Sequence, residues 1–137
     1  MTQMHQRRTL SDWANGLALF AVGGLAIQAA AADSKRVDFN FQIRPLLSDR
    51  CFTCHGPDEK ARKKKLRLDT KEGIFKVLED GNAVVKPSHP EKSELVRRIF
   101  AEDDELMPPQ KSNLKLSAAE KDLLKRWVAE GAEFKQH

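Results

Sequence analysis

The chain has 137 residues, and its 24 basic and 20 acidic side chains give a formal net charge of +4. After removal of an N-terminal leader, this length is enough for one small domain and no more. The weak positive charge gives no indication of nucleic-acid binding. Only two cysteines are present, so no disulfide framework competes for them.

The N-terminus has the features of a secretory signal peptide. Arg7 and Arg8 form a basic region, an apolar run covers about residues 17–27, and four alanines precede Asp33. Small residues in that position are typical of a cleavage site. We therefore predict a cleavable leader over residues 1–32 and a periplasmic or otherwise exported protein.

A retained membrane anchor is the alternative for this segment. Residues 13–32 have about the length that spans a bilayer, but glycines and polar residues dilute their hydrophobicity. We expect contact with a membrane only if the leader is retained. Residues 33–137 are predicted to form a single domain, because no repeat or Ser/Gly-rich linker divides them.

The first helix of the domain is predicted to run from about Asn40 towards Cys51. Asp38 or Asn40 provides the N-cap, and Pro45 is tolerated near the first turn. The apolar residues that we expect to face the core are Phe41, Ile43, Leu46 and Leu47.

The stretch Cys51–His55 reads Cys-Phe-Thr-Cys-His, which is typical of covalent attachment of a c-type haem. Two thiols three residues apart lie on one face of a helical turn. Both can then form thioether bonds with the vinyl groups of the porphyrin. His55 follows directly and supplies an axial nitrogen to the iron. The motif predicts one haem c held by Cys51, Cys54 and His55.

Two other chemistries use similar residues. A thiol–disulfide oxidoreductase carries C-x-x-C at the start of a helix that follows a strand, but no strand pattern precedes Cys51, and His55 would have no purpose there. A zinc site would need a fourth ligand that the sequence does not assign, and His55 lies too close to the cysteines for the usual spacing. Haem attachment fits the sequence better than either.

Two further helices are predicted after the motif. One begins at Asp69 or Thr70, ends at Gly81, and carries three apolar residues inward: Ile74, Phe75 and Leu78. The other follows Ser88 as its N-cap and has Pro90 in its first turn. Its apolar residues on one side are Leu95, Val96, Ile99 and Phe100.

The last helix has the clearest signals. Ser117 and Glu120 form a capping box at its start, and Gly131 is expected to end it. Its apolar residues recur at three- and four-residue spacing: Leu123, Leu124, Trp127 and Val128. No alternating strand pattern occurs in the chain. We predict an all-α domain of about four short helices around one covalently attached haem.

The sixth position on the iron has few candidate ligands. Met107 is the only methionine after the leader, and two prolines follow it. His/Met ligation suits electron transfer, although a lone methionine commonly fills a gap in a core. The rivals are His89, in a proline-rich turn, and His137, at the terminus. An open or different sixth ligand would indicate a haem-based sensor or a redox enzyme subunit.

Short motifs follow one another in a definite order between residues 41 and 132. They are Ile43–Leu47, Cys51–Asp58, Leu66–Thr70, Pro87, Pro90, Ser93–Leu95, Arg97–Ile99, Met107–Pro109, Leu116–Ser117, Arg126–Val128 and Gly131–Ala132. In the sequence and order of these motifs, the chain resembles the planctomycete-type cytochrome c domain, a small class I-like mono-haem module. The resemblance implies haem attachment at Cys51 and Cys54, His55 as the proximal ligand and Met107 as the distal ligand. Where the family usually has glycines around the turn before the third helix, this chain has Asn82 and Ser88.

The strongest charge run is Lys60–Arg67. It could dock an acidic redox partner near the haem edge, neutralise a haem propionate, or form a solvated loop. No aromatic residues interleave it, so it does not fit nucleic-acid binding. Opposite charge gathers in Glu102–Glu105, which we expect to form an exposed loop leading into Met107. We predict a single-electron carrier and not an enzyme.

Overall fold

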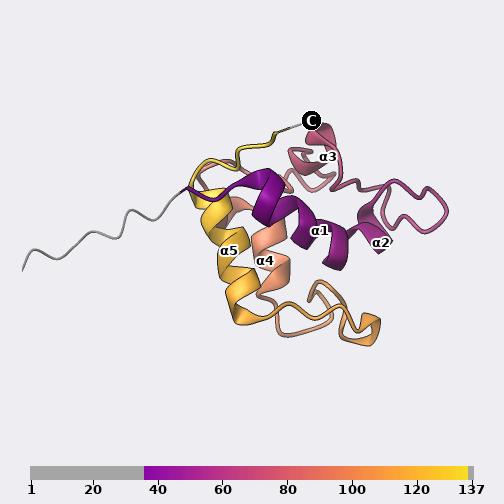
Figure 1. Cartoon of the computed structure of the whole chain (residues 1–137). Helices are drawn as coiled ribbons and strands as arrows, with labels where there is room; N and C mark the ends of the chain where they lie inside the picture. Colours follow the sequence, from indigo (N-terminus) through magenta and orange to yellow (C-terminus); the bar gives the residue numbers. More distant parts are fainter. Residues whose placement is uncertain (1–35, 136–137) are drawn as a thin grey trace, which may run out of the picture. The chain divides into compact units, whose positions relative to one another are not determined.

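The computed structural model describes residues 36–135, and within them the chain is helical (Figure 1). Five short α-helices and three turns of other helical type occur in this range, with isolated β-bridges and no strand. The all-α prediction is confirmed for these residues, with five helices in place of about four. None of the described helices is long and apolar enough to cross a membrane. The leader predicted over residues 1–32 and the rival ligand His137 lie outside the described residues.

The first helix opens with a π-helical turn, η1 (Phe39–Ile43), and continues as α1 (Arg44–Arg50). The Asp38 carboxylate accepts a hydrogen bond from the Phe41 amide at 3.0 Å, so it caps the helix as predicted. The prediction that Phe41 faces the core is wrong, because its side chain is 84% exposed. The wide π turn shifts the register, and Phe39 is buried instead. The other predicted core residues of this helix are buried: Ile43, Leu46 and Leu47.

Two single-turn helices follow, α2 (Phe52–His55) and α3 (Lys71–Ile74). Thr70 caps α3, as predicted, by accepting a hydrogen bond from the Gly73 amide at 3.2 Å. A Cβ atom at Gly73 would lie 1.7 Å from a backbone carbonyl oxygen of the preceding segment, so only glycine allows the two to approach.

The α3 helix is shorter than predicted, because it does not continue to Gly81. Backbone hydrogen bonds to a returning segment take the place of the missing helical turns. The Val84 amide donates to the Lys76 carbonyl at 2.9 Å, and the Val85 amide donates to the Ile74 carbonyl at 3.1 Å. Both valines are buried, so this return segment forms part of the core without being helical.

The third predicted helix begins later than expected. The single 3₁₀ turn η2 (Pro90–Lys92) comes first, and α4 (Glu94–Ile99) then starts after Ser93. The prediction of Ser88 as the N-cap is wrong: Ser88 has φ +63°, and its amide donates to the Val128 carbonyl at 2.9 Å. Pro90 begins a turn of its own, which delays the helix by five residues. Phe100 is 43% exposed, whereas the other predicted core residues are buried: Leu95, Val96 and Ile99.

The last helix, α5 (Ala118–Ala129), follows the single turn η3 (Gln110–Ser112) and agrees with its prediction. The Glu120 amide donates to the Ser117 hydroxyl at 3.2 Å, and the Ser117 amide donates to the Glu120 carboxylate at 2.7 Å. Beyond the helix, Gly131 has φ +104°, a conformation that glycine adopts without strain.

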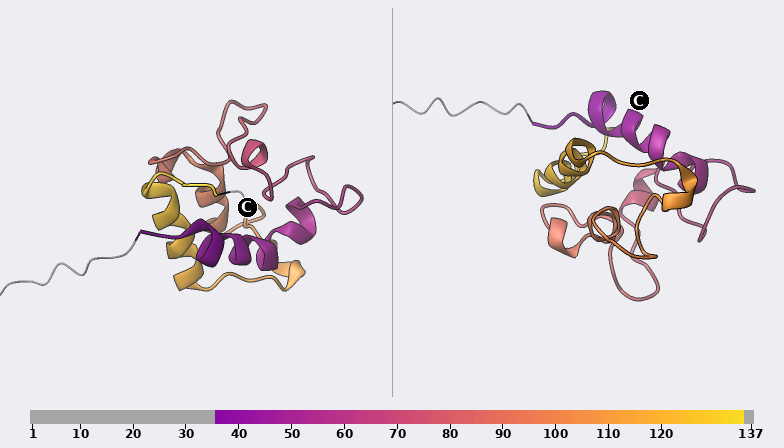
Figure 2. Two further views of the ribbon diagram at one scale, coloured as in Figure 1. Left: turned by 45° about the horizontal axis from the view of Figure 1, so that its top comes forward. Right: turned by 90° about the horizontal axis from the view of Figure 1, so that it is seen from below.

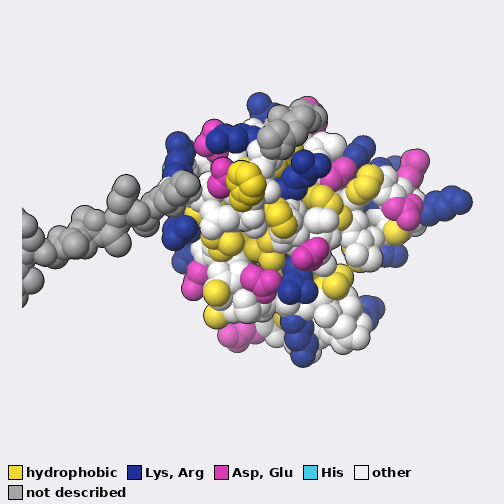
Figure 3. Space-filling model, in the orientation of Figure 1, with side chains coloured by type: hydrophobic (Ala, Val, Ile, Leu, Met, Phe, Trp, Pro, Cys, Tyr) yellow, Lys and Arg dark blue, Asp and Glu magenta, His cyan; other side chains and the backbone are white. Residues whose placement is uncertain are grey.

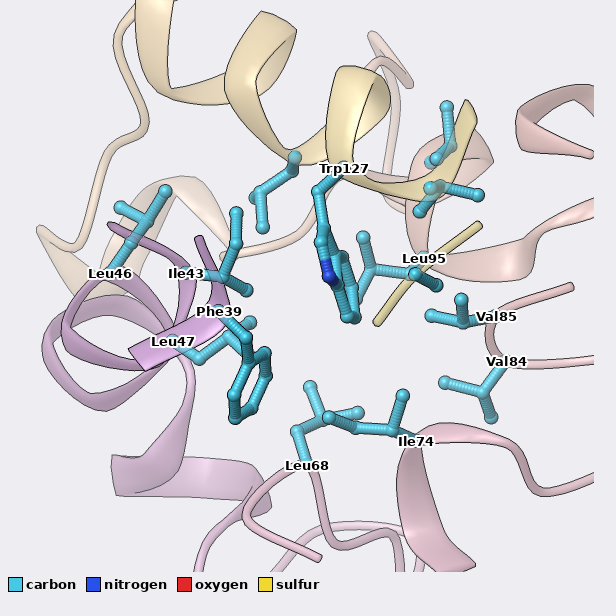
Figure 4. Close-up of a cluster of buried hydrophobic side chains, with 14 of the residues drawn as sticks. Phe39, Ile43, Leu46, Leu47, Leu68, Ile74, Val84, Val85, Leu95 and Trp127 are labelled. Atoms are coloured by element: carbon cyan, nitrogen blue, oxygen red, sulfur yellow. The ribbon is translucent and has the colours of Figure 1, made fainter. Parts of the chain in front are cut away.

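The core lies where η1 packs against α5 and α5 packs against α4 (Figure 2). Trp127 extends from α5 into the middle of the buried cluster, with Phe39 and Ile43 to one side and Val85 to the other (Figure 4). The centres of the Trp127 and Phe39 rings are 5.8 Å apart. The Trp127 indole donates to the Glu133 carbonyl at 3.0 Å, so its polar atom is satisfied.

Candidate functional site

The two cysteines and the histidine of the motif lie on one helical turn. Cys51 follows α1 and directly precedes α2, and its carbonyl accepts hydrogen bonds from the amides of Cys54 at 3.1 Å and His55 at 2.8 Å. Both thiols are free, and all three residues are partly exposed. The structure therefore presents two thiols and an imidazole from a single turn.

The chain returns to this turn through the segment that follows it. The Lys63 amide donates to the Cys54 carbonyl, and the Leu68 amide donates to the His55 carbonyl, both at 2.7 Å. The last carbonyls of a helix have no partner within the helix. The returning segment satisfies these two carbonyls and fixes the end of α2.

Gly56 and Arg62 tighten the start of the same segment. Gly56 is buried, and a Cβ atom there would lie 2.3 Å from the Phe52 carbonyl oxygen. The Arg62 side chain donates to the Gly56 carbonyl at 3.0 Å and to the Pro57 carbonyl at 2.7 Å. The turn after His55 is thus held by close packing and by a side chain of the predicted basic run.

Burial controls the protonation of two groups in the motif. Loss of hydration raises the pKa of the Cys51 thiol to about 12, against a smaller lowering by the charge of Arg50. Burial also lowers the pKa of His55 below its ordinary value, and the nearby backbone carbonyls of Lys63 and Leu66 oppose part of this effect. At neutral pH the turn therefore holds a neutral Cys51 thiol and a neutral imidazole.

These properties fit haem attachment better than thiol–disulfide exchange. An exchange reaction needs a thiolate with a lowered pKa, and the pKa of Cys51 is raised. The Nδ1 atom of His55 is buried and has no hydrogen-bond partner among the described residues. A neutral imidazole is the form that binds metals. Two thiols and this imidazole are therefore a suitable donor set for haem c.

Met107 lies between α4 and η3, and its side chain is partly buried. Its amide donates to the Arg98 carbonyl at 3.0 Å, which links the Met107 backbone to α4. The η3 turn, three residues after Met107, lies on the same side of the described domain as α2 (Figures 1 and 2). The segment that carries Met107 thus runs on the side of the domain where the motif lies.

The rival ligand His89 lies on the surface. Its side chain is 47% exposed, and its Nδ1 atom is 3.1 Å from the Glu91 carboxylate. One ring nitrogen therefore already has a partner outside the motif. This arrangement agrees with a solvated turn residue.

A polar cluster that the sequence analysis missed joins α4 to the Met107 segment. Its members are Glu94, Arg97, Arg98 and Glu105, here called the Glu94–Glu105 cluster. The buried Glu94 accepts two hydrogen bonds from Arg97, at 2.7 and 2.8 Å, and one from Arg98 at 2.7 Å. The bonds from Arg97 are the main reason that the pKa of Glu94 falls to about 2. The helical spacing of Glu94 to the two arginines could have indicated these pairs, but no sequence signal pointed to Glu105.

The basic run Lys60–Arg67 is an irregular loop whose two arginine side chains are bonded to other groups, unlike its lysines at 63–65. Arg62 binds backbone carbonyls as described, and Arg67 pairs with Asp69. Residues 63–65 are exposed lysines, and none of them forms an ion pair within residues 36–135. Figure 3 shows basic side chains at the tip of the loop that projects beside α2. Residues 102–104 of the acidic run are exposed, as predicted, whereas Glu105 is only partly exposed and pairs with Arg97.

A C-x-x-C-H turn in a helical domain is typical of proteins that bind haem c covalently. The family model of Planctomycete cytochrome C matches residues 51–111 of this chain, from the first cysteine of the motif to beyond Met107. The match supports a planctomycete-type cytochrome c domain, and such a domain implies a haem c bound at the C-x-x-C motif. No match was found among the curated proteins or the solved structures.

Proposed function

We propose that the protein is a mono-haem c-type cytochrome that carries single electrons. The observation that carries this proposal is the α2 turn, where two free thiols and a neutral imidazole emerge together at the start of the family match. A haem bound there supplies a one-electron iron couple. The protein itself does little bond chemistry; it binds the porphyrin, tunes its potential and limits access of water.

Each site residue has a definite role in this proposal. Cys51 and Cys54 form the two thioether bonds, which fix the porphyrin to α2. His55 is the proximal ligand, and its buried surroundings keep the imidazole unprotonated. Met107 is the distal ligand, and a thioether in that position raises the reduction potential relative to a second histidine.

We base the proposed partner on the charge of the exposed lysines and the proposed location on the N-terminal sequence. The exposed lysines 63–65 lie in the loop bonded to the carbonyls of Cys54 and His55. We propose that they attract an acidic redox protein and that salt weakens this encounter. Export of the chain requires the leader over residues 1–32, and N-terminal sequencing of the exported protein should begin near Asp33.

The attachment test uses the full chain, exported together with haem-attachment machinery. Intact-protein mass spectrometry should show one added haem, and the haem should survive acid-acetone extraction. The double variant Cys51→Ala, Cys54→Ala should retain no covalent haem. A wild-type protein without added haem would show that the proposal is wrong.

The distal ligand has its own test. Met107→Ala should keep the haem, lower the potential and abolish the weak sulfur-to-iron charge-transfer band of the ferric protein. His89→Ala is the matched control and should leave band and potential unchanged. An unaltered ferric spectrum in the Met107 variant would exclude His/Met ligation and favour a sensor or redox enzyme subunit.

A further inference from the structure

The Glu94–Glu105 cluster connects a helix to the segment that carries the proposed distal ligand. Glu105 pairs with Arg97 through Nη1, and Arg97 Nη2 donates to its second oxygen at 3.3 Å. The same guanidinium holds Glu94, whose side chain is only 10% exposed. Arg97 therefore bridges a buried carboxylate of α4 and a carboxylate two residues before Met107.

The backbone around Glu105 is fixed at the same place. The Met107 amide donates to the Arg98 carbonyl at 3.0 Å. The Asp103 carboxylate accepts a hydrogen bond from the Glu105 amide at 2.9 Å, and its carbonyl accepts one from the Leu106 amide at 3.0 Å. The Glu105 side chain and the Met107 amide thus bond to α4, and the two bonds to Asp103 fix the turn in the loop between them.

Apolar packing does not replace these bonds. None of residues 101–116 is buried, and among them only Leu116, at the far end of the segment, packs against the core. A segment with little buried apolar surface opens at low free-energy cost unless other contacts hold it. The polar contacts to α4 are therefore the main restraint on the position of Met107 that the structure shows.

We propose that Glu105 and Arg97 are positioning residues that keep Met107 in place as the distal haem ligand. This inference rests on the proposed function. Without the ion pair, a larger fraction of molecules has the segment detached from α4. An added ligand that competes with Met107 then binds more tightly in proportion to that fraction.

The experiment measures binding of imidazole to the ferric holoprotein by optical titration. Glu105→Gln should bind imidazole about three to five times more tightly than the wild type, the effect expected for loss of one partly exposed ion pair. The Met107 amide should exchange its hydrogen faster by a similar factor. Arg97→Gln should bind imidazole at least as tightly as Glu105→Gln, because Arg97 also holds the buried Glu94. The double variant should bind imidazole no more tightly than Arg97→Gln, because the Arg97–Glu105 pair is already lost in that variant.

Arg126→Gln is the matched control. This substitution removes an ion pair between Arg126 on α5 and Glu130 at the end of that helix. The exposed fraction of the Arg126 side chain is 47%, compared with 48% for Arg97. Imidazole affinity of this control should equal that of the wild type.

Three outcomes would count against the proposals. A wild-type ferric protein without the sulfur-to-iron band would overturn Met107 ligation and the positioning role with it. A normal band with unchanged imidazole affinity in Glu105→Gln would overturn the positioning role alone, even if amide exchange became faster. An equal effect of Arg126→Gln would also overturn it, because the change would then reflect general destabilisation.

Discussion

Two regions of the described domain are held together in different ways. The first region, made of η1, α1, α4 and α5, is stabilised by buried apolar side chains around Trp127 (Figure 4). The second region consists of residues 57–67 and 101–116, and none of these residues is buried. Leu66 and Leu116 pack against the edge of the core. The other contacts are hydrogen bonds and ion pairs, through Arg62 in one segment and Glu105 in the other.

The difference bears on the site, because the second region follows His55 and contains Met107. Segments without an apolar core of their own adapt to a large apolar partner more easily than packed helices do. A porphyrin attached at Cys51 and Cys54 would add apolar contacts to these segments, in which no residue is buried. We therefore expect the haem to stabilise the second region more than the first.

The largest effect is expected from Trp127→Ala in the first region. Trp127 is 1% exposed, and truncation of a buried aromatic side chain to alanine costs about 3–5 kcal/mol. The measurement is the free energy of unfolding of the holoprotein in urea. Leu116→Ala, which removes a partly buried side chain of the second region, should cost clearly less; equal costs would contradict the comparison.

A smaller loss is expected from Gly73→Ala, where α3 meets the end of the 57–67 segment. The new Cβ atom would lie 1.7 Å from the Arg67 carbonyl oxygen, and overpacking of this kind costs about 3 kcal/mol. Gly81→Ala is the control, since Gly81 has φ +85° but no atom near its Cβ position. That variant should lose about 1 kcal/mol from backbone strain alone. Equal losses in urea unfolding would show that the segment yields to the clash.

The Glu94–Glu105 cluster, which joins the two regions, should respond to acid. The pKa of Glu94 is about 2, below its ordinary value of 4.5. Its stabilising contribution is therefore complete above pH 4.5 and is lost as the pH falls towards 2. We expect the difference in unfolding free energy between wild type and Glu94→Gln to be largest near neutral pH and to vanish near pH 2. A difference independent of pH would contradict the role of the charged carboxylate.

The smallest effect is expected at Phe100, on the border of the two regions. The Nζ atoms of Lys121 and Lys125 lie 5.6 and 5.7 Å from the centre of its ring. Phe100→Leu keeps an apolar side chain and removes these cation–π contacts, which should cost about 0.5 kcal/mol in urea unfolding. Val77→Ala, at a side chain 60% exposed, should leave stability unchanged.

Local signals predicted the elements that local interactions determine. The capping box at Ser117 and the spacing of Trp127 gave α5 correctly, because both depend on residues three or four apart. The position of the motif on a helical turn was predicted for the same reason. The exposure of Phe41 and the late start of α4 were not predicted. A π turn before α1 and a separate proline turn before α4 shift the helical register, and the amino-acid composition gives no sign of either turn. Glu105 was missed because it joins α4 across a loop, where no periodicity applies.

The two ends of the described domain meet, and this bears on the order in which the chain can mature. The Val37 amide donates to the Glu130 carboxylate at 2.7 Å across 93 positions, and Phe39 contacts the ring of Trp127. These contacts cannot form until the chain has been delivered as far as Glu130, because synthesis proceeds from the N-terminus. The cysteines lie in the middle of the sequence, so they emerge well before the core can close around Trp127. We expect this interval to leave both thiols accessible to the haem-attachment machinery while the domain is still open.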